Sequence, residues 1–523
     1  MHHPHRAIVP LCVLAALAAP PLSAQTASAS PDAASRAAES IEEATFRQRA
    51  AVIAHDSMRG RDNPSPGLDL TAAWAASEFG RIGLRPAGDA GSYVQRYRLR
   101  RTKRDTSTTL TGTTAGVTRA WRLGRDFALL GGNPPDASVD LPVVLLSGIP
   151  ADGSRPFGAV DVRGAAVLHV VTPEQLAGPV VNQLIGQGIA AGVGAWIAVA
   201  DVPAPRWAGW LRRSLAAEQW ELVGGTGALD GGVPPVIALR DSAVAGLLAA
   251  AGVDLATLHA PAGQGVRALS GVRLVLQSRR VVLDEPTLPN VVGILEGGDR
   301  RLREEAVVFV AHMDHMGVTA GGRCAAIGAD SICNGANDNA SGTVAVIEMA
   351  EAFASMRPRP ARSMVFAIVS GEEIGLFGSS HLANNPPVPL SRTVAAITLD
   401  EIARNTPDTM IVVGKGFSSL GATVDAVVSA HPELGLPAID DLWPEQNYFQ
   451  RSDHYPFARL GVPALAFYGG GSAEVHRPND AVETADWGKA ARIARLVFLT
   501  ALEVANTAAR PTWDGAARAR VVR

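Results

Sequence analysis

The sequence predicts an α/β fold in which a mostly parallel, mixed sheet is sandwiched by helices. From residue 290 onward, short and almost wholly apolar segments follow one another, among them "NVVGILEG", "EEAVVFVAHMD", "SMVFAIVSGEE", "VAAITLDEI", "TMIVVG" and "VPALAFYGG". Helical patterns lie between several of them, and residues 341–356 place Val344, Ile347 and Ala350 on one face. Near-continuous apolar strands that alternate with helices are typical of a sheet buried on both faces.

The first residues of the chain predict a secretory signal peptide at residues 1–24. Arg6 supplies a positive charge, residues 7–22 are mainly apolar, and small residues precede an expected cleavage after Ala24. The apolar stretch is short and interrupted by prolines, which makes a membrane anchor the weaker interpretation. We therefore expect an exported protein, periplasmic or secreted, without a membrane span after cleavage.

Residues 25–105 are expected to begin the main domain. The first part, residues 25–40, is rich in Ala and Ser and is expected to be mobile. A helical pattern follows at 40–54, and a second one covers 68–84 and stops near Gly83. The segment "YVQRYRLRR" then alternates like a strand.

Residues 106–285 differ from the rest of the chain in composition and in the spacing of apolar segments. Short Val, Ile and Leu runs are separated by turns rich in Gly and Pro, acids are sparse, and no metal-ligand spacing is present. We expect a β-rich inserted domain of α/β character here, and the alternative is a continuation of one large sheet. Residues 286–510 then form the core of the main domain, and 511–523 a C-terminal tail.

The charge balance excludes one class of partner. The chain has 47 Lys and Arg against 50 Asp and Glu, for a net charge of -3, and no clustered basic helix. A nucleic-acid-binding protein would show a basic patch, so none is expected as a partner. The sequence does not predict the oligomeric state.

Two cysteines, Cys324 and Cys333, follow the signal peptide. In an oxidising compartment a pair nine residues apart can close a small loop, and the alternative is two unpaired thiols. Because the pair lies between His312 and Asp338 in the chain, we expect a disulfide that shapes the rim of a pocket.

Acids and histidines gather where the expected strands end. In parallel strands of an open α/β sheet these ends share one edge, where sites form. Four expected strands end in such residues: His312 and Asp314 follow one, Glu372 and Glu373 the next, then Asp400, and then His476. A fifth segment adds Asp338, which precedes the helix at 341–356.

This set suits two divalent cations about 3.5–4 Å apart, which need one shared carboxylate and a histidine and carboxylate each. The expected ligands are Asp338 as the bridge, His312 and Asp400 on one ion, and Glu373 and His476 on the other. Glu372 is then free to take a proton from a water between the ions. Taken singly, each residue has an ordinary structural explanation, such as a helix cap for Asp338.

Two neighbours of the ligands are given supporting roles. Asp314 is expected to orient His312 through its second ring nitrogen. His315 is expected to be structural or to support a ligand without binding metal itself.

The motifs "AHMDHMG", "NGANDNASG", "SGEEIGLFGSSHLA", "TLDEIAR", "RSDHYPFARLGVPAL" and "EVHRPND" resemble, in order and spacing, the family-28 metallopeptidases. The resemblance covers about 40–105 and 285–505. It implies a zinc-exopeptidase fold with a mainly eight-stranded mixed sheet, two Zn ions (other divalent transition metals are possible), and aminopeptidase activity on peptides. Residues 106–285 more loosely resemble the protease-associated domain that many members carry as an insert.

Some positions depart from the family pattern. Many relatives have tyrosine where this chain has Val475, so Tyr468, Tyr455 or a metal ion alone is expected to hold the developing oxyanion. Glu401 stands where methionine is common and is expected to anchor a free α-amino group.

Asp453 and His454 are expected to line the substrate pocket, unless they pack beneath the sheet edge. The function expected from the whole set is that of an exported zinc-dependent aminopeptidase. The alternatives are a carboxypeptidase or dipeptidase on the same site, and a non-catalytic peptide-binding protein with a vestigial metal site.

Overall fold

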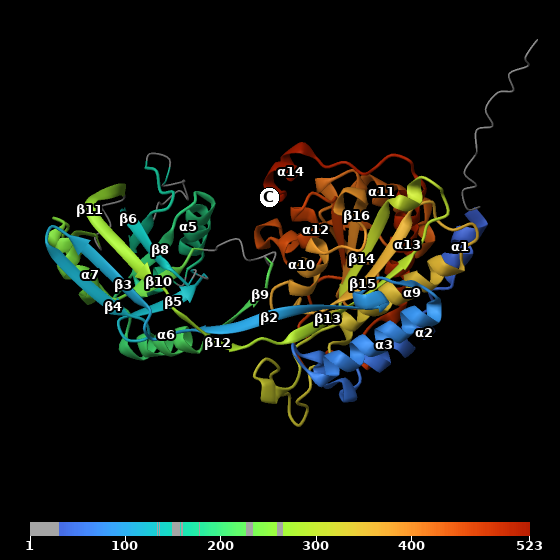
Figure 1. The fold of residues 1–523 in the computed structure, drawn as a ribbon, viewed down its shortest axis with the longest axis horizontal. Coiled ribbons are helices and arrows are strands. Elements are labelled where there is room, and N and C mark those ends of the chain that lie inside the picture. The colour runs from blue at the N-terminus through green and yellow to red at the C-terminus, as the bar shows by residue number, and fades with distance from the viewer. Residues whose placement is uncertain are drawn as a thin grey trace, which may run out of the picture.

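The computed structural model describes residues 31–523 except 133, 135, 149–156, 158–159, 177, 226–233 and 259–264. The expected signal peptide, with its cleavage after Ala24, lies outside the described residues. The described residues form an eleven-stranded sheet and an eight-stranded sheet, in two lobes that an extended arm joins (Figure 1).

The larger sheet carries the strand ends at which the site was expected. In spatial order its strands are β12 (Arg280–Asp284), β2 (Val94–Arg104), β13 (Thr287–Leu295), β15 (Ser363–Val369), β14 (Ala306–His312), β16 (Thr393–Asp400), β19 (Ala464–Tyr468), β17 (Met410–Val413) and β18 (Ala438–Asp440). Two further strands, β1 (Arg85–Pro86) and β9 (Glu218–Leu222), pair with β13 and β2.

The sheet is mixed, as expected, but its parallel part is smaller than expected. Strands β15, β14, β16 and β19 are parallel neighbours, and β17 pairs in parallel with β18. The ladders of β13 with β15 and of β17 with β19 are antiparallel, as are the ladders that β2 forms. An apolar run reports burial on both faces and not strand direction, so the sequence pattern could not distinguish these cases.

Helices cover both faces of this sheet, and β14 shows the division most plainly. Val307, Phe309 and Ala311 pack into the core on one face, whereas Val308 and Val310 pack into the core on the other. Successive side chains of a strand point to opposite faces, so a strand buried on both sides must be apolar throughout.

Among the described residues, six helices contribute to the first core alone, and three more contribute to the second, one of them to both. The first six are α1 (Pro31–Glu39), α2 (Glu43–Ile53), α3 (Pro66–Ile82), α9 (Gly342–Ser355), α11 (Leu420–Ala430) and α13 (Trp487–Asn506). The other three are α10 (Phe377–Asn384), α12 (Tyr455–Arg459) and α14 (Gly515–Val521). Helix α3 ends at Gly83, as expected, because Gly83 adopts a left-handed conformation with φ of 82°.

Two terminal segments are more ordered than their composition indicates. Residues 31–39, expected to be mobile, form α1, and Ala37 and Ala38 are buried in the core. Residues 511–523, expected to be a tail, carry α14, whose Val521 is buried. In both cases the segment is ordered because it packs onto the core, and amino-acid composition alone does not reveal such packing.

The smaller sheet is built from residues 109–277, within the expected insert. Its strands, in spatial order, are β4 (Val117–Arg122), β3 (Thr109–Thr114), β11 (Gly265–Gln277), β6 (Ser138–Ser147), β7 (Ala166–Val170), β8 (Ala195–Val199), β10 (Val236–Leu239) and β5 (Phe127–Gly131). It is separate from the larger sheet, so the alternative of one continuous sheet is wrong.

Helices accompany the smaller sheet, in keeping with the expected α/β character of the insert. They are α4 (Pro173–Leu176), α5 (Pro179–Ala190), α6 (Ala204–Ala216), α7 (Asp241–Ala250) and α8 (Leu255–Leu258). The arm between the lobes consists of β2, β12 and β9 (Figure 1). Strands β9 and β12 account for two of the three strands beyond the eight implied by the family resemblance. The domain boundaries and the likeness to a protease-associated domain stay predictions.

Among the described residues, no helix combines the length and apolar character needed to cross a bilayer.

Candidate metal centre

The expected ligands lie together at one edge of the larger sheet. His312 and Asp400 are the last residues of β14 and β16, and Glu373 lies in the turn after β15. His476 lies in the loop after β19, and Asp338 lies in the helical turn 336–341 before α9. Because β15, β14, β16 and β19 are parallel neighbours, their carboxyl ends bring these segments together.

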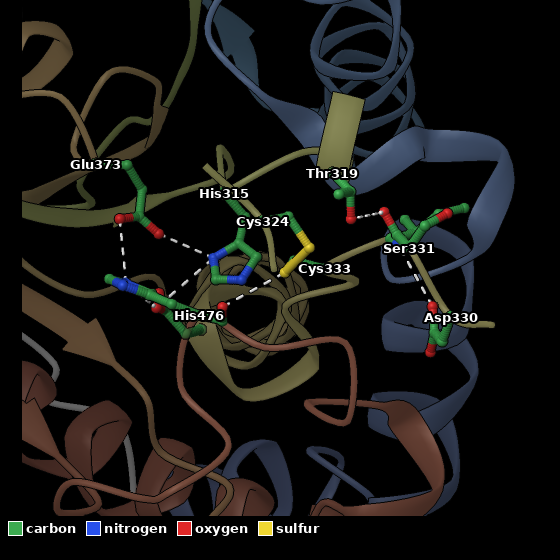
Figure 2. The surroundings of a disulfide bond; sticks show 10 residues. His315, Thr319, Cys324, Asp330, Ser331, Cys333, Glu373 and His476 are labelled. Atoms are coloured by element: carbon green, nitrogen blue, oxygen red, sulfur yellow. Dashed lines mark hydrogen bonds and ion pairs between the residues drawn. A yellow bond between two sulfur atoms is a disulfide. The ribbon is translucent and has the colours of Figure 1, made fainter. Parts of the chain in front are cut away.

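Asp338 lies between two groups of donors. Its Oδ1 is 3.4 Å from His312 Nε2, and its Oδ2 is 3.1 Å from His476 Nε2. His312 Nε2 lies 3.3 Å from Asp400 Oδ1, and His476 Nε2 lies 3.2 Å from Glu373 Oε2 (Figure 2 shows the latter pair). Each group therefore contains one imidazole and one unshared carboxylate, and the two oxygens of Asp338 face one group each.

The chemistry of these donors fits divalent metal ions. Donor atoms of His312, Glu372 and Asp400 lie within 4.8 Å of one another, as do those of His315, Asp338 and Glu373. Carboxylates gathered in a poorly solvated place repel one another unless cations offset their charge. Mixed nitrogen and oxygen donors suit zinc and similar ions.

The pKa values of the neighbouring glutamates Glu372 and Glu373 are shifted in opposite directions. Burial raises the pKa of Glu372 well above its ordinary value, and the nearby Glu373 and Asp400 carboxylates add to this. Burial also opposes ionisation of Glu373, but hydrogen bonds with His315 and His476 outweigh it and lower the pKa of Glu373. Two titratable groups whose pKa values are driven apart suit different chemical roles, here proton transfer and metal binding.

His315 is closer to the donors than a merely structural residue would be. It is fully buried, and its Nδ1 lies 2.9 Å from Glu373 Oε1 and 3.6 Å from Asp338 Oδ2 (Figure 2). Its Nε2 has no hydrogen-bond partner within the described residues. The geometry lets His315 either hold the Glu373 carboxylate or offer a further nitrogen to the same ion. The sequence signal was its position three residues after His312, which says nothing about where the ring points.

Asp314 acts differently from the expectation. His312 Nδ1 lies 3.2 Å from the main-chain oxygen of Asp314 but 3.7 Å from its carboxylate, so the main chain and not the side chain orients the ring. The carboxylate instead accepts a hydrogen bond from Asn63 Nδ2 (2.5 Å) and from the main-chain N–H groups of Glu372 and Glu373 (3.3 Å each). Asp314 therefore fixes the turn that carries both glutamates.

Three residues that support the expected ligands were not identified from the sequence. Asp480 accepts hydrogen bonds from the main-chain N–H groups of Asn337 and Asp338 at 3.0 Å. Ser452 Oγ donates to Asp400 Oδ2 at 2.7 Å, and Asn63 holds Asp314. Asp480 lies in the quoted motif "EVHRPND" and Ser452 in "RSDHYPF", so their presence was visible but their partners were not.

Arg61 is a buried cation behind the site. Its guanidinium donates to the main-chain oxygens of Met313 (2.6 Å), Ile53 (2.8 Å), Asn334 (2.7 Å) and Gly335 (3.0 Å). Burial lowers the pKa of Arg61 to about 10, with nearby acids opposing the shift, so the group stays charged at neutral pH. Arg61 thereby ties together the chain segments that lead to His315 and Asp338.

The Arg61→Met variant is expected to lose about 3–5 kcal/mol of unfolding free energy, because it strands several buried carbonyl acceptors without a donor. Urea unfolding followed by circular dichroism measures this. Arg392→Met is the matched control, because Arg392 is exposed and pairs only with Glu304 among the described residues. A loss below about 1 kcal/mol for Arg61→Met, similar to an ordinary exposed substitution, would contradict the assigned role.

A cavity of about 470 Å³ opens beside the donors. Its lining includes Glu401, Tyr468 and Val475, and apolar groups from Leu376, Val413 and Ala466. Asp400 and Tyr468 are paired in register on β16 and β19, so Tyr468 lies next to one expected ligand. Tyr455 is buried and outside this lining, so of the two tyrosines expected to hold the oxyanion Tyr468 is the one that lines the cavity.

Asp453 and His454 do not line this cavity, which corrects the first of the two expectations for them. Both are fully buried, and the cavity is lined by Arg451 and Ser452 instead. His454 packs against Phe449 with ring centroids 4.7 Å apart, and burial lowers the pKa of His454 to about 3. Burial raises the pKa of Asp453 to about 7. Both side chains therefore pack beneath the sheet edge, which was the second expectation.

The expected disulfide between Cys324 and Cys333 is present. Cys333 Sγ lies 3.4 Å from the main-chain oxygen of His476, so the bridge lies against one of the expected ligands (Figure 2).

Known sequences match this part of the chain. The profile of peptidase family M28 matches residues 290–501. Leupeptin-inactivating enzyme 1 of Streptomyces exfoliatus is 28% identical over 144 residues, which is 27% of this chain and 31% of that protein. A probable zinc metalloprotease of Pyricularia oryzae is 51% identical over 104 residues, which is 20% of this chain and 18% of that protein. The chain thus spans less than two thirds of the length of these curated relatives.

Among solved structures, an aminopeptidase from Aneurinibacillus sp. strain AM-1 aligns over 92% of this chain and 97% of its own, with 17% identity and a TM-score of 0.48. The family match in sequence includes the segments that carry His312, Asp338, Glu373, Asp400 and His476. Residues 290–501 therefore match the model of peptidase family M28, and the relative from Pyricularia oryzae is named a probable zinc metalloprotease.

Proposed function

We propose that this chain is an exported di-metal aminopeptidase that removes N-terminal residues from peptides. The observation that carries the proposal is the placement of Asp338, whose two oxygens face two imidazole–carboxylate groups, with Glu372 beside them at a cavity. A vestigial site would not be expected to keep a complete donor set in this arrangement.

The five expected ligands supply the metal-binding groups of the proposed enzyme. His312 and Asp400 would hold one ion, Glu373 and His476 the other, and Asp338 both. When bound, two zinc ions polarise the scissile carbonyl and lower the pKa of the attacking water.

Glu372 is the proton carrier. Its carboxylate accepts a proton from the attacking water and returns it to the amine that leaves. The raised pKa of Glu372 suits both steps, since it brings the group closer to the pH at which it must take up and release a proton.

Glu401 is proposed to anchor the free α-amino group. It lines the cavity, and its Oε2 lies 3.4 Å from Asn337 Nδ2. Burial raises the pKa of Glu401 well above its ordinary value, with Asp338 and Asp400 adding to the shift, and an ammonium group in the cavity would offset that charge.

The Glu401→Gln variant is expected to raise KM for peptides with a free N-terminus by about tenfold, because one charge-assisted hydrogen bond is lost. Steady-state kinetics on a free-terminus peptide and its N-acetyl derivative measure this. The variant keeps the size of the side chain, so an unchanged KM for the free-terminus peptide would remove the proposed anchor.

The position of Arg451 supports a second candidate function for the same site. It lines the cavity and stacks over Tyr448, with the guanidinium carbon 4.8 Å from the ring centroid, and no ion pair of Arg451 occurs among the described residues. A free guanidinium at this place could bind the C-terminal carboxylate of a short substrate, as a dipeptidase or carboxypeptidase requires.

A panel of four peptides separates these functions. Zinc-loaded protein is given a peptide with both termini free, its N-acetyl form, its C-amidated form and a dipeptide. An aminopeptidase cleaves the free and C-amidated peptides and spares the N-acetyl form. Cleavage of the N-acetyl form with loss of the C-amidated activity indicates a carboxypeptidase, and binding without any hydrolysis rejects the enzymatic proposal.

Export is supported by the N-terminal sequence pattern and by the disulfide, since stable disulfides are rare in a reducing cytosol. N-terminal sequencing of protein recovered outside the cytoplasm is expected to begin at Gln25. Recovery of the full-length chain in the cytoplasmic fraction would reject export.

A further inference from the structure

The disulfide loop, residues 317–333, is fastened beside the metal centre. The main-chain N–H of Gly317 donates to Gly60 O at 2.9 Å, and that of Cys333 donates to Gly317 O at 3.0 Å. The tip of the loop, residues 325–331, is exposed, whereas both cysteines are buried. The base of the loop is thus fixed, whereas its tip and residues 319–322 face solvent.

Arg323 connects this loop to one expected ligand. Its Nη2 donates to the main-chain oxygen of Glu373 at 2.9 Å, and its Nη1 donates to Asp62 Oδ1 at 2.9 Å. The Glu373 carboxylate lies 4.0 Å from the same guanidinium. Arg323 therefore holds the main chain of Glu373 in place and leaves its carboxylate free to bind metal.

The disulfide lies against His476, which is expected to hold the same ion as Glu373. The Cys333 sulfur has no proton to donate, so its 3.4 Å approach to His476 O is a packing contact. His476 has a positive φ of 61°, and its side chain is 43% exposed, whereas those of Asp338 and Glu373 are 5% exposed. His476 is the least enclosed of the three, so its position depends more on what supports its main chain.

These contacts are one-sided. Figure 2 shows the bridge close to His476, with the His315 ring between the bridge and Glu373. Among the described residues, no hydrogen bond or ion pair joins the disulfide loop to His312 or Asp400. Of the two donor groups, the loop's hydrogen bonds and its sulfur contact therefore reach the one that would hold the second ion.

We propose that Arg323 and the Cys324–Cys333 disulfide are positioning groups that set the affinity of the Glu373–His476 metal site while leaving the His312–Asp400 site unchanged. The inference rests on the proposed di-metal function. Residues that orient ligands without binding the metal typically change affinity by about 10–100-fold.

Cobalt titration of the metal-free protein tests this, with visible absorption to report coordination and elemental analysis to count ions. In Arg323→Met and in the double variant Cys324→Ser/Cys333→Ser, the first Co²⁺ is expected to bind within about twofold of the unaltered protein. The second is expected to bind about 10–100-fold more weakly. Arg323→Lys should recover part of the loss, because lysine can reach one acceptor but lacks the fork that joins two.

Arg392→Met is the control, since Arg392 lies in an exposed ion pair and should leave both binding steps unchanged. Equal weakening of both steps in Arg323→Met, or no weakening of either, would overturn the proposal. Failure of the proposed di-metal function is seen separately, because the unaltered protein would then bind fewer than two Co²⁺ per chain.

Discussion

Replacing Glu372 with glutamine is expected to lower kcat by about 10²–10⁴-fold while two metal ions stay bound. The amide has nearly the shape of the carboxylate but cannot accept a proton from water. The main-chain N–H of Glu372 keeps its hydrogen bond to Asp314, so the turn should hold its conformation. KM should change little, because the change removes proton transfer and not substrate binding.

The adjacent residue offers a matched comparison. Glu373→Gln makes the same chemical change one residue further on, but it alters a carboxylate that lies 3.2 Å from His476 Nε2 and is expected to bind metal. Elemental analysis should therefore find two ions in Glu372→Gln and fewer in Glu373→Gln.

Two outcomes for Glu372→Gln would contradict its role. Near-normal turnover would show that another group moves the proton. Loss of an ion would make Glu372 a ligand alongside His312 and Asp400, which their mutual distances permit.

The expected ligand set could be read from the sequence because four of its members lie at or after the ends of apolar strands, and the fifth, Asp338, precedes a helix. His312 and Asp400 end β14 and β16, and the edge at which parallel strands end is fixed by the fold class. The structure brings all five expected ligands together there.

The supporting residues could not be read in the same way. Asp480 acts on main-chain N–H groups about 140 positions earlier, at Asn337 and Asp338, and such a contact has no sequence spacing of its own. Asp314 illustrates the same limit, since its carboxylate bonds to Asn63 and to the Glu372–Glu373 turn and not to the neighbouring His312 ring.

The sequence patterns also did not predict the direction of every strand or the ordered structure near the chain ends. Strand β13, like β14, is buried along almost all of its length, yet β13 runs antiparallel to β15. Burial on both faces demands mainly apolar residues whatever the direction of the strand. Helix α1 is rich in alanine, and its order comes from the core on which Ala37 and Ala38 pack.

Asp338→Asn is expected to abolish the binding of both ions at micromolar metal, and activity should fall by at least about 10³-fold with them. Among the described residues, Asp338 is the one carboxylate with oxygens near both His312, at 3.4 Å, and His476, at 3.1 Å. An amide offers one weaker oxygen donor and cannot offset charge at both places. Asp400→Asn is the comparison, because Asp400 lies near His312 alone and its loss should release one ion and leave the other. Elemental analysis after dialysis counts the ions, and two ions retained by Asp338→Asn would show that the two groups bind metal independently, without a shared carboxylate.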